Sequence, residues 1–98
     1  MIFSLEPNQI GMSRLDRLNG SDFEISISVG ELHQGKGFGK VILKRSVEYA
    51  LGTLHARHVI ARIHRKNTKS QKLFQNIGFK PMHKIITVGT FKTFWIGN

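Results

Sequence analysis

Alternation of hydrophobic and polar residues dominates the first third of the chain and predicts strands. The clearest case runs from Phe23 to Val29, where every second residue is apolar and the residues between are Glu24 and two serines. Such alternation is typical of a strand with one buried and one polar face. Asn19 and Gly20 precede it, and both tolerate the positive φ of a tight hairpin turn. A further apolar run, Ile2–Leu5, predicts another short strand, so the N-terminal part is expected to form an antiparallel meander.

The middle strand of this meander, Gln9 to Leu18, alternates less regularly. Ile10 and Met12 would share one buried face, whereas Leu15 falls out of phase with them. A bulge or a strand end near Arg14 would explain the slip, because one extra residue reverses the side on which later side chains lie.

The apolar spacing then changes to that of a helix. Lys40 to Leu51 carries an apolar stripe along one side, and Gly52 suits the C-terminal cap. Alternation returns from His55 to His64 and predicts another strand. Because strand, helix and strand follow one another, a right-handed crossover would make the two strands parallel. The apolar stripe on the predicted helix is formed by Leu43, Val47, Ala50 and Leu54.

The last third predicts a short helix that ends at Gly78, followed by strands at Phe79–Val88 and Thr90–Ile96, divided near Gly89. The expected fold class is therefore α/β (α+β): a mixed central sheet with an antiparallel N-terminal meander, one parallel strand pair and two packing helices. We expect a single domain spanning residues 1–98. The short helix before Gly78 is predicted because Ser70, Leu73, Phe74 and Ile77 form a stripe along one side of it.

A glycine-rich segment joins the Phe23–Val29 strand to the following helix. Gly35, Gly37 and Gly39 remove side chains where backbone N–H groups could approach an anion, and Lys36 and Lys40 add positive charge. A strand, a glycine-rich loop and a helix N-terminus together can hold a diphosphate. A plain turn is the alternative that the glycines alone leave open.

Two common phosphate-binding patterns do not fit this segment. The P-loop requires Ser or Thr after Gly-Lys, and Val41 and Ile42 stand there instead. The dinucleotide fingerprint requires its third glycine one residue later and an acidic residue about 20 residues on. No acidic residue stands at that distance, where the sequence has His58–Ala61 instead.

The pattern that remains is Q-x-x-G-x-G, formed by Gln34, Gly37 and Gly39. It resembles the coenzyme A loop of the GNAT superfamily of N-acetyltransferases. A second segment, N-x-x-S-x-x-L-F-x-x-x-G-F from Asn67 to Phe79, resembles the family's second cofactor-contacting motif at the family's spacing. The resemblance covers residues 10–82 and implies a GNAT-like fold, in which the parallel strands splay apart to admit acetyl-CoA.

The resemblance also implies how the cofactor is held. The loop amides would bind the pyrophosphate, the end of the preceding strand would pair with the pantetheine arm, and the Val29 N–H would face the thioester oxygen. Asn67 would reach the pantetheine amides from the other side. Phe74 stands where many relatives carry a tyrosine that acts as an acid, and it has no proton to give. The implied cofactor-binding residues are Ile27, Val29, Gln34, Gly35, Lys36, Gly37, Phe38, Gly39, Lys40, Asn67 and Phe74.

Glu24 and Val29 are the candidate catalytic residues. Some relatives place a glutamate near the position of Glu24 that deprotonates the amine through water, and an ordinary exposed strand glutamate is the alternative. His64, at the end of the next strand, is a second candidate base, and a surface or packing role is its alternative. The five histidines show no tight ligand spacing, so we expect no metal.

Charge and cysteine content bound the partners. The net charge is +9, from 15 Lys and Arg against 6 Asp and Glu, which suits a phosphorylated cofactor or nucleic acid. The basic clusters coincide with the two motifs and have few aromatic neighbours, so we expect no nucleic-acid partner. The chain has no cysteine and no apolar run of membrane-spanning length, and its first residues, M-I-F-S-L-E-P, do not have the pattern of a signal peptide. We therefore expect a cytoplasmic protein without a membrane partner.

The family normally begins with a strand and two helices that wall the acceptor site, and this chain has no residues for them before Met1. We therefore expect a domain truncated at the N-terminus, with an open acceptor side that a homodimer could cover. Phe91, Phe94 and Trp95 are candidate dimer contacts, and core strand positions are their alternative.

The expected function is transfer of acetyl from acetyl-CoA to a primary amine of a small molecule. Gly11–Val29 looks most like relatives that act on nucleotide-linked amino sugars. One alternative is a coenzyme A-binding module with weak or no catalysis, which Phe74 and the missing N-terminal part favour. The second is a small basic nucleic-acid-binding domain.

Overall fold

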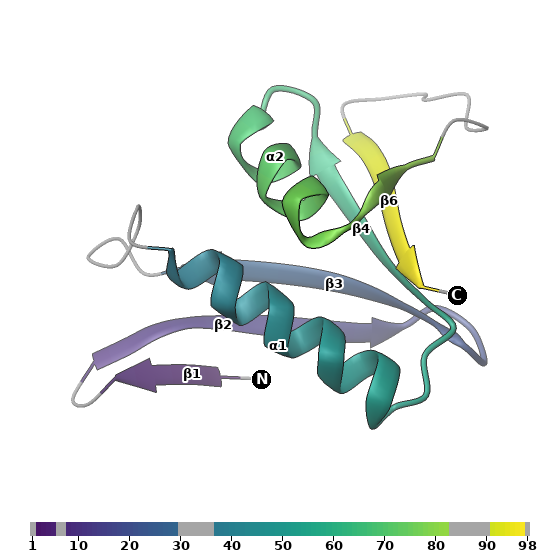
Figure 1. Cartoon of the computed structure of the whole chain (residues 1–98), viewed down its shortest axis with the longest axis horizontal. Helices are drawn as coiled ribbons and strands as arrows, with labels where there is room; N and C mark the ends of the chain where they lie inside the picture. Colours follow the sequence, from purple (N-terminus) through teal and green to yellow (C-terminus); the bar gives the residue numbers. More distant parts are fainter. Residues whose placement is uncertain (1, 6–7, 30–36, 83–90, 98) are drawn as a thin grey trace.

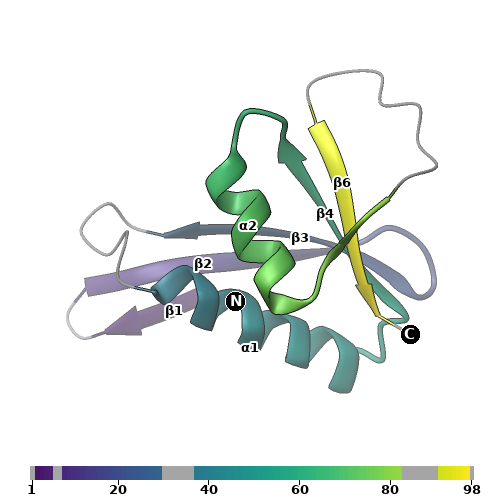
Figure 2. The same ribbon diagram turned by 45° about the horizontal axis from the view of Figure 1, so that its top comes forward.

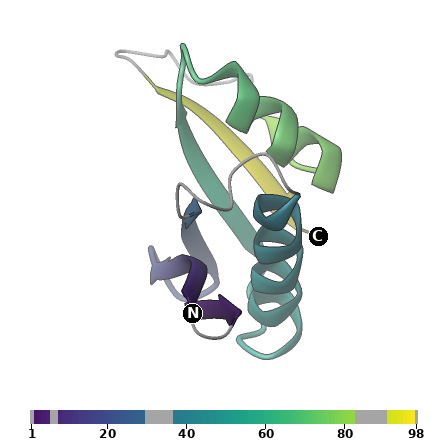
Figure 3. The same ribbon diagram turned by 90° about the vertical axis from the view of Figure 1, so that its left-hand side faces the viewer.

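The computed structural model describes residues 2–5, 8–29, 37–82 and 91–97 of the 98-residue chain. Within these residues, six strands form one mixed sheet in the order β1-β2-β3-β4-β6-β5 (Figure 1). The two described helices, α1 and α2, lie on one side of it (Figure 3). The elements are β1 (Ile2–Leu5), β2 (Asn8–Arg17), β3 (Asp22–Val29), α1 (Phe38–Gly52), β4 (His58–His64), α2 (Thr68–Ile77), β5 (Lys80–Pro81) and β6 (Phe91–Gly97).

The predicted fold class is confirmed. β1, β2 and β3 form the antiparallel meander, β3 and β4 are parallel, and β4, β6 and β5 continue the sheet with antiparallel pairing. β4 begins at His58 and not at His55, because His55 has a φ of +54°, outside the range of a strand.

The predicted irregularity near Arg14 is wrong. β2 pairs with β3 without interruption from Gly11 to Arg17. The register shift lies on the other edge of β2, where Phe3 pairs with Gly11 and Ser4 with Gln9. The out-of-phase apolar residue in the sequence therefore does not mark a break in the strand.

The buried face of β2 also differs from the expected one. Met12 is 43% exposed, whereas Gly11 and Ser13 are buried and Leu15 packs against the core. The hydrophobic pattern misled because α1 approaches this face so closely that small residues are needed there. A Cβ on Gly11 would lie 2.9 Å from Ile42 Cδ1 on α1, and it would also overlap the carbonyl oxygen of Ser28 on β3.

The core lies between the sheet and the helices, and the predicted helix stripe is confirmed. α1 extends the expected helix by two residues at its start and ends one residue later, at a cap on Thr53. Three stripe residues are buried among apolar side chains of β3, β4 and β6, and the fourth packs against them beyond the end of the helix. These residues are Leu43, Val47, Ala50 and Leu54.

The C-terminal part combines confirmed and corrected expectations. α2 ends before Gly78, which has a φ of +120°, as predicted. β5 is only two residues long, and residues 83–90, with the division predicted near Gly89, lie outside the described part. Of the three candidate dimer contacts, Phe94 is 1% exposed, which supports its alternative core role, whereas Trp95 is partly buried and Phe91 is 51% exposed on the opposite face.

The sheet face away from the helices, which we call the open face, has no other described element over it (Figure 3). It is mainly polar, which is the strand alternation predicted from the sequence. Among the described residues, this face carries the contacts Arg14–Asp16, His58–Asp22 and Arg62–Glu24, of which the second is an ion pair only when His58 is protonated.

Candidate cofactor and acceptor site

The parallel strands β3 and β4 pair only at their first residues and then part. The register pairs are Asp22 with His58, Phe23 with Val59 and Glu24 with Ile60, although both strands continue well beyond them. β3 stays paired with β2 and β4 stays paired with β6, so each strand follows its own half of the sheet. The divergence is visible in two views (Figure 1; Figure 2). The predicted splayed pair is thus present.

A groove of about 660 Å³ lies between the end of β3, the start of α1 and one side of α2. It gathers most of the residues that the two sequence motifs predicted for cofactor binding. Those lining the groove are Ile27, Val29, Gly37, Gly39, Lys40 and Asn67. Segments far apart in the chain therefore meet at one place.

The start of α1 suits an anion. Gly37 is the N-cap with a φ of +82°, it supplies no side-chain cap, and the first turn carries no acidic residue. The N–H groups of a first helical turn lack intrahelical partners, and the helix dipole favours negative charge there. A Cβ on Gly39 would lie 3.4 Å from Leu73 Cδ2 and 3.6 Å from Val29 Cγ2, so a larger side chain would fill the groove.

Two lysines on α2 add to the positive charge of the groove and were not singled out from the sequence. Lys69 and Lys72 line the groove opposite Lys40, and Asn76 continues the same side of the helix. Their spacing of three and four residues places them on one helix face, which is the signal that could have found them. Lys40, Lys69 and Lys72, together with a helix start that has no side-chain cap and no acidic residue in its first turn, fit a ligand that carries a diphosphate.

A second cavity of about 280 Å³ lies in the gap between β3 and β4. Its walls include Ile25 and Ala61 from the helix side and Ser26 and Arg62 from the open face, so it crosses the thickness of the sheet. It adjoins the groove, since Ile27 and two residues around the start of α2 line both cavities.

Asn67 lies at the junction of the two cavities and caps α2. Its Oδ1 accepts a hydrogen bond of 3.1 Å from the backbone N–H of Ser70. An amide oxygen can only accept hydrogen bonds, and this one already accepts from the helix. Any hydrogen bond that Asn67 donates to a ligand must therefore come from its side-chain NH₂ group.

The first candidate base, Glu24, lies on the open face at the last paired position of β3. Arg62 donates from Nε to Oε2 of Glu24, and from Nη2 to Oε1 at 3.3 Å. The Glu24 side chain is 17% exposed and that of Arg62 is 63% exposed. The hydrogen bond to Glu24 raises the pKa of the Arg62 guanidinium above its usual value. Each carboxylate oxygen has two lone pairs, so Glu24 can accept a proton while Arg62 remains bound.

His64, the second candidate base, ends β4 and lines the gap cavity. Its Nδ1 accepts a hydrogen bond of 3.1 Å from the backbone N–H of Lys66, and its ring lies edge-on to Phe91 at 5.7 Å. Neutral His64 therefore carries its proton on Nε2 and has no spare lone pair for a substrate. This arrangement supports the alternative packing role.

The remaining predicted residues divide into three groups. Phe74 is buried, with its ring 5.0 Å from that of Phe79, and it forms part of the wall of the gap cavity. Phe38 is the first residue of α1 and is partly buried. Gln34, Gly35 and Lys36 lie outside the described residues.

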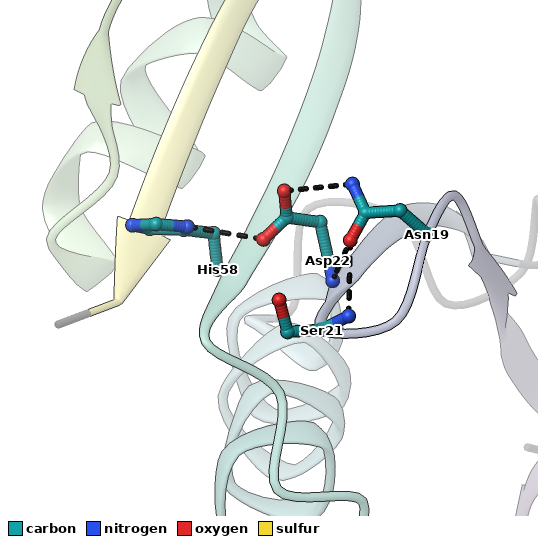
Figure 4. A network of polar contacts seen from close by, with 4 residues as sticks. All are labelled: Asn19, Ser21, Asp22 and His58. Atoms are coloured by element: carbon teal, nitrogen blue, oxygen red, sulfur yellow. Dashed lines mark hydrogen bonds and ion pairs between the residues drawn. The ribbon is translucent and has the colours of Figure 1, made fainter.

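A second polar cluster lies where β3 and β4 begin, at the opposite end of their paired segment. His58 Nδ1 is 3.0 Å from Asp22 Oδ1, and Asn19 donates to Asp22 Oδ2 at 3.0 Å (Figure 4). Asn19 Oδ1 also accepts from the backbone N–H groups of Ser21 and Asp22. The pKa of Asp22 is lowered, first by the hydrogen bond from Asn19 and then by His58 and Arg57, while burial acts in the opposite direction.

The described residues contain no cluster of three His, Cys, Asp or Glu side chains that could hold a metal ion. No described helix is both long and apolar enough to cross a membrane.

Comparison with known proteins identifies related sequences. A family model for the acetyltransferase (GNAT) domain matches residues 1–80. The chain is 30% identical over 70 residues to the uncharacterized N-acetyltransferase p20 of Bacillus licheniformis, covering 71% of this chain and 39% of that protein. It is 28% identical over 76 residues to the spermidine N(1)-acetyltransferase of Vibrio cholerae, covering 76% and 44%. The chain thus spans about two fifths of the length of these curated relatives.

Solved structures show the same fold. A chimera of the spermidine N-acetyltransferase SpeG from Vibrio cholerae with hSSAT superposes with a TM-score of 0.84 at 23% identity, covering 97% of this chain and 63% of that one. A dodecameric structure of the Vibrio cholerae enzyme in an intermediate state has a TM-score of 0.81 at 23% identity, covering 91% and 57%. With the family model matched over residues 1–80, the chain belongs to the GNAT family of acetyltransferases.

Proposed function

We propose that this chain binds acetyl-CoA and transfers its acetyl group to a primary amine of a small molecule. The observation that carries the proposal is the parting of β3 and β4 after Glu24 and Ile60, beside a groove that leads to the start of α1, where Gly37 supplies no side-chain cap. Membership of a family that generally uses acetyl-CoA supports the same cofactor.

The groove residues divide the work of holding the cofactor. The backbone N–H groups at the start of α1 and the ammonium groups of Lys40, Lys69 and Lys72 hold the diphosphate. Gln34, Gly35 and Lys36 belong to the same predicted loop. The stretch of β3 from Ile27 to Val29, which lies beyond the last register pair with β4, hydrogen-bonds the pantetheine arm as a neighbouring strand would, and Asn67 donates to the arm from across the gap.

Acetyl-CoA supplies an activated acetyl thioester. The Val29 N–H is the proposed hydrogen-bond donor to the thioester oxygen, and such a donor lowers the barrier by about 3 kcal/mol in comparable sites. Phe74 has no proton to give, so the departing thiolate leaves unassisted or takes a proton from water. Departure of the thiolate without an acid is feasible because a thiol, with a reference pKa of ~8.5, is acidic enough to leave as its anion.

The amine reaches the thioester from the open face. The gap cavity supports this route, because its walls come from both faces of the sheet and it adjoins the groove. Glu24 is the proposed base, and it accepts the proton through water while it stays paired with Arg62, because each carboxylate oxygen has two lone pairs. Among the acceptors, a polyamine is the first class to test, since one relative is named for spermidine. A nucleotide-linked amino sugar finds no support among the relatives described above.

The test is a matched pair of glycine variants in α1. Gly39→Val would fill the groove against Leu73, whereas Gly52→Val at the other end of the helix meets open space. We expect acetyl-CoA to raise the melting temperature of the wild type and of Gly52→Val, but not of Gly39→Val. A wild type without a shift would overturn the proposal, and a shift retained in Gly39→Val would reject this groove as the site.

A coenzyme A-binding module without catalysis is the second candidate, favoured by Phe74 in place of an acid. Thiol release in the presence of spermidine and other primary amines separates the two functions. A melting-temperature shift without thiol release from any amine would favour the second candidate. A nucleic-acid-binding role gains no support from the family assignment.

A further inference from the structure

We infer that the Glu24–Arg62 ion pair is a clasp that fixes how far β3 and β4 part, and thereby sets the affinity for acetyl-CoA. In this role Arg62 and Glu24 are positioning residues. The inference rests on the proposed function, because the opening that it controls is the proposed cofactor site.

The position of the pair is the first argument. Glu24 belongs to the last register pair of β3 and β4, opposite Ile60. Arg62 lies two residues further along β4, in the part that no longer pairs with β3, and its side chain contributes to the gap cavity. The ion pair therefore crosses from the last paired position of one strand to the first diverging stretch of the other.

The second argument is that backbone hydrogen bonds do not set the divergence. Beyond Glu24, β3 is held by β2 as far as the pair of Val29 with Gly11. Beyond Ile60, β4 is held by β6 as far as the pair of His64 with Phe91. Packing across the gap must therefore fix the separation of the strands. On the helix side α1 contacts both β3 and β4, and on the open face the Glu24–Arg62 pair links them where the separation begins.

The third argument is the geometry of the clasp itself. Arg62 engages both oxygens of Glu24, and a two-pronged pair between guanidinium and carboxylate restricts orientation as well as distance. The Glu24 side chain is 17% exposed but that of Arg62 is 63% exposed, so the clasp acts through the fixed geometry of the two bonds and not through a strong charge attraction.

Neighbouring charges make Arg62 the natural partner of Glu24. Asp16 lies directly opposite Glu24 on β2, and like charges at such positions repel. Asp16 is itself paired with Arg14 at 3.0 Å. Loss of the Arg62 charge would leave Glu24 against Asp16, and would free β4 to move relative to β3.

The chain offers a matched control at the other end of the same paired segment. Asp22 and His58 also link β3 to β4 on the open face, with Nδ1 and Oδ1 3.0 Å apart (Figure 4). Neither residue lines the groove or the gap cavity. Loss of this pair would lower stability without changing the opening.

The experiment measures acetyl-CoA affinity by calorimetry, together with the melting temperature of each unliganded variant. We expect Arg62→Gln and Glu24→Gln to weaken binding at least fivefold, and His58→Gln to change it less than twofold. The double variant Glu24→Arg/Arg62→Glu, which exchanges the partners, should regain part of the lost affinity. Should Arg62→Gln fail to fold, Arg62→Lys keeps the charge but loses the fork, and its affinity should lie below that of the wild type.

The outcomes separate the two claims. A wild type that binds acetyl-CoA, with Arg62→Gln (or, if that variant does not fold, Arg62→Lys) binding equally well, would overturn the clasp alone. Equal weakening by His58→Gln, or an exchanged pair no better than the single variants, would also count against it. A wild type without measurable affinity would overturn the proposed function and the clasp with it.

Discussion

The hydroxyl oxygens of Ser13 on β2 and Ser46 on α1 lie 2.6 Å apart, and both residues are buried. Ser46 Oγ is also 2.7 Å from the carbonyl oxygen of Ile42. Because a carbonyl can only accept, Ser46 donates to Ile42, and Ser13 then donates to Ser46. This contact fixes the helix against the meander at a point where the sequence shows no hydrophobic pair.

We expect Ser13→Ala and Ser46→Ala each to lower the free energy of unfolding by about 1–2 kcal/mol, since each removes a hydrogen bond between buried groups. The double variant should cost less than the sum of the two. Urea unfolding of all four proteins in the cycle measures the coupling. Strict additivity would show that the two hydroxyls do not interact.

Substitution of Gly11 tests how closely α1 approaches β2. A Cβ there would overlap the carbonyl oxygen of Ser28 and lie 2.9 Å from Ile42 Cδ1. We expect Gly11→Ala to destabilise the fold by about 1–3 kcal/mol or more, as overpacking does. Gly20→Ala is the control, because a Cβ at Gly20 meets nothing within 4 Å. Equal unfolding midpoints for the two variants would contradict this packing.

We expect the side-chain oxygen of Asn67 to cap α2 and its NH₂ group to donate to the cofactor. Asn67→Ala removes the cap of α2 and should cost about 1 kcal/mol of stability, together with acetyl-CoA affinity. Asn67→Asp keeps an oxygen for the Ser70 N–H but loses the NH₂ donors. It should therefore remain stable and bind acetyl-CoA more weakly. Unchanged affinity in Asn67→Asp would exclude the donor role.

The contribution of Asp22 and its hydrogen-bond partners to stability should decrease at low pH. The pKa of Asp22 lies below the ordinary value of 3.8, so the folded chain favours the ionised carboxylate. The resulting stabilisation is complete above that value and is lost as the pH falls through the folded-state pKa. The stability difference between wild type and Asp22→Asn should therefore shrink below about pH 4. Urea unfolding between pH 3 and pH 7 measures it, and a constant difference would refute the linkage.

The fold was largely predictable because its strands and helices bury clearly periodic faces. The alternation at Phe23–Val29 and the stripe on α1 are both found in the structure. The buried face of β2 was not predictable, since it is occupied by Gly11 and Ser13 and carries little hydrophobic signal. The place of β6 between β4 and β5 was equally hidden, because the pairing of strands distant in sequence is not written in their periodicity.

The candidate site was predictable where the two motifs that resemble the family's mark it. Gly37, Gly39 and Asn67, from both motifs, line one groove. The Glu24–Arg62 pair escaped because it depends on the register between two strands, which a single sequence does not specify. Glu24 therefore looked like a free carboxylate.

The placement of β6 has a consequence for shortened chains. β5 reaches the sheet only through β6, where Lys80 pairs with Trp95 and Pro81 with Phe94. A chain ending before Phe91 would lose both strands in one step and leave the backbone of β4 with an unsatisfied edge. Such an edge recruits strands from other molecules, so we expect these truncations to aggregate instead of folding into a smaller domain.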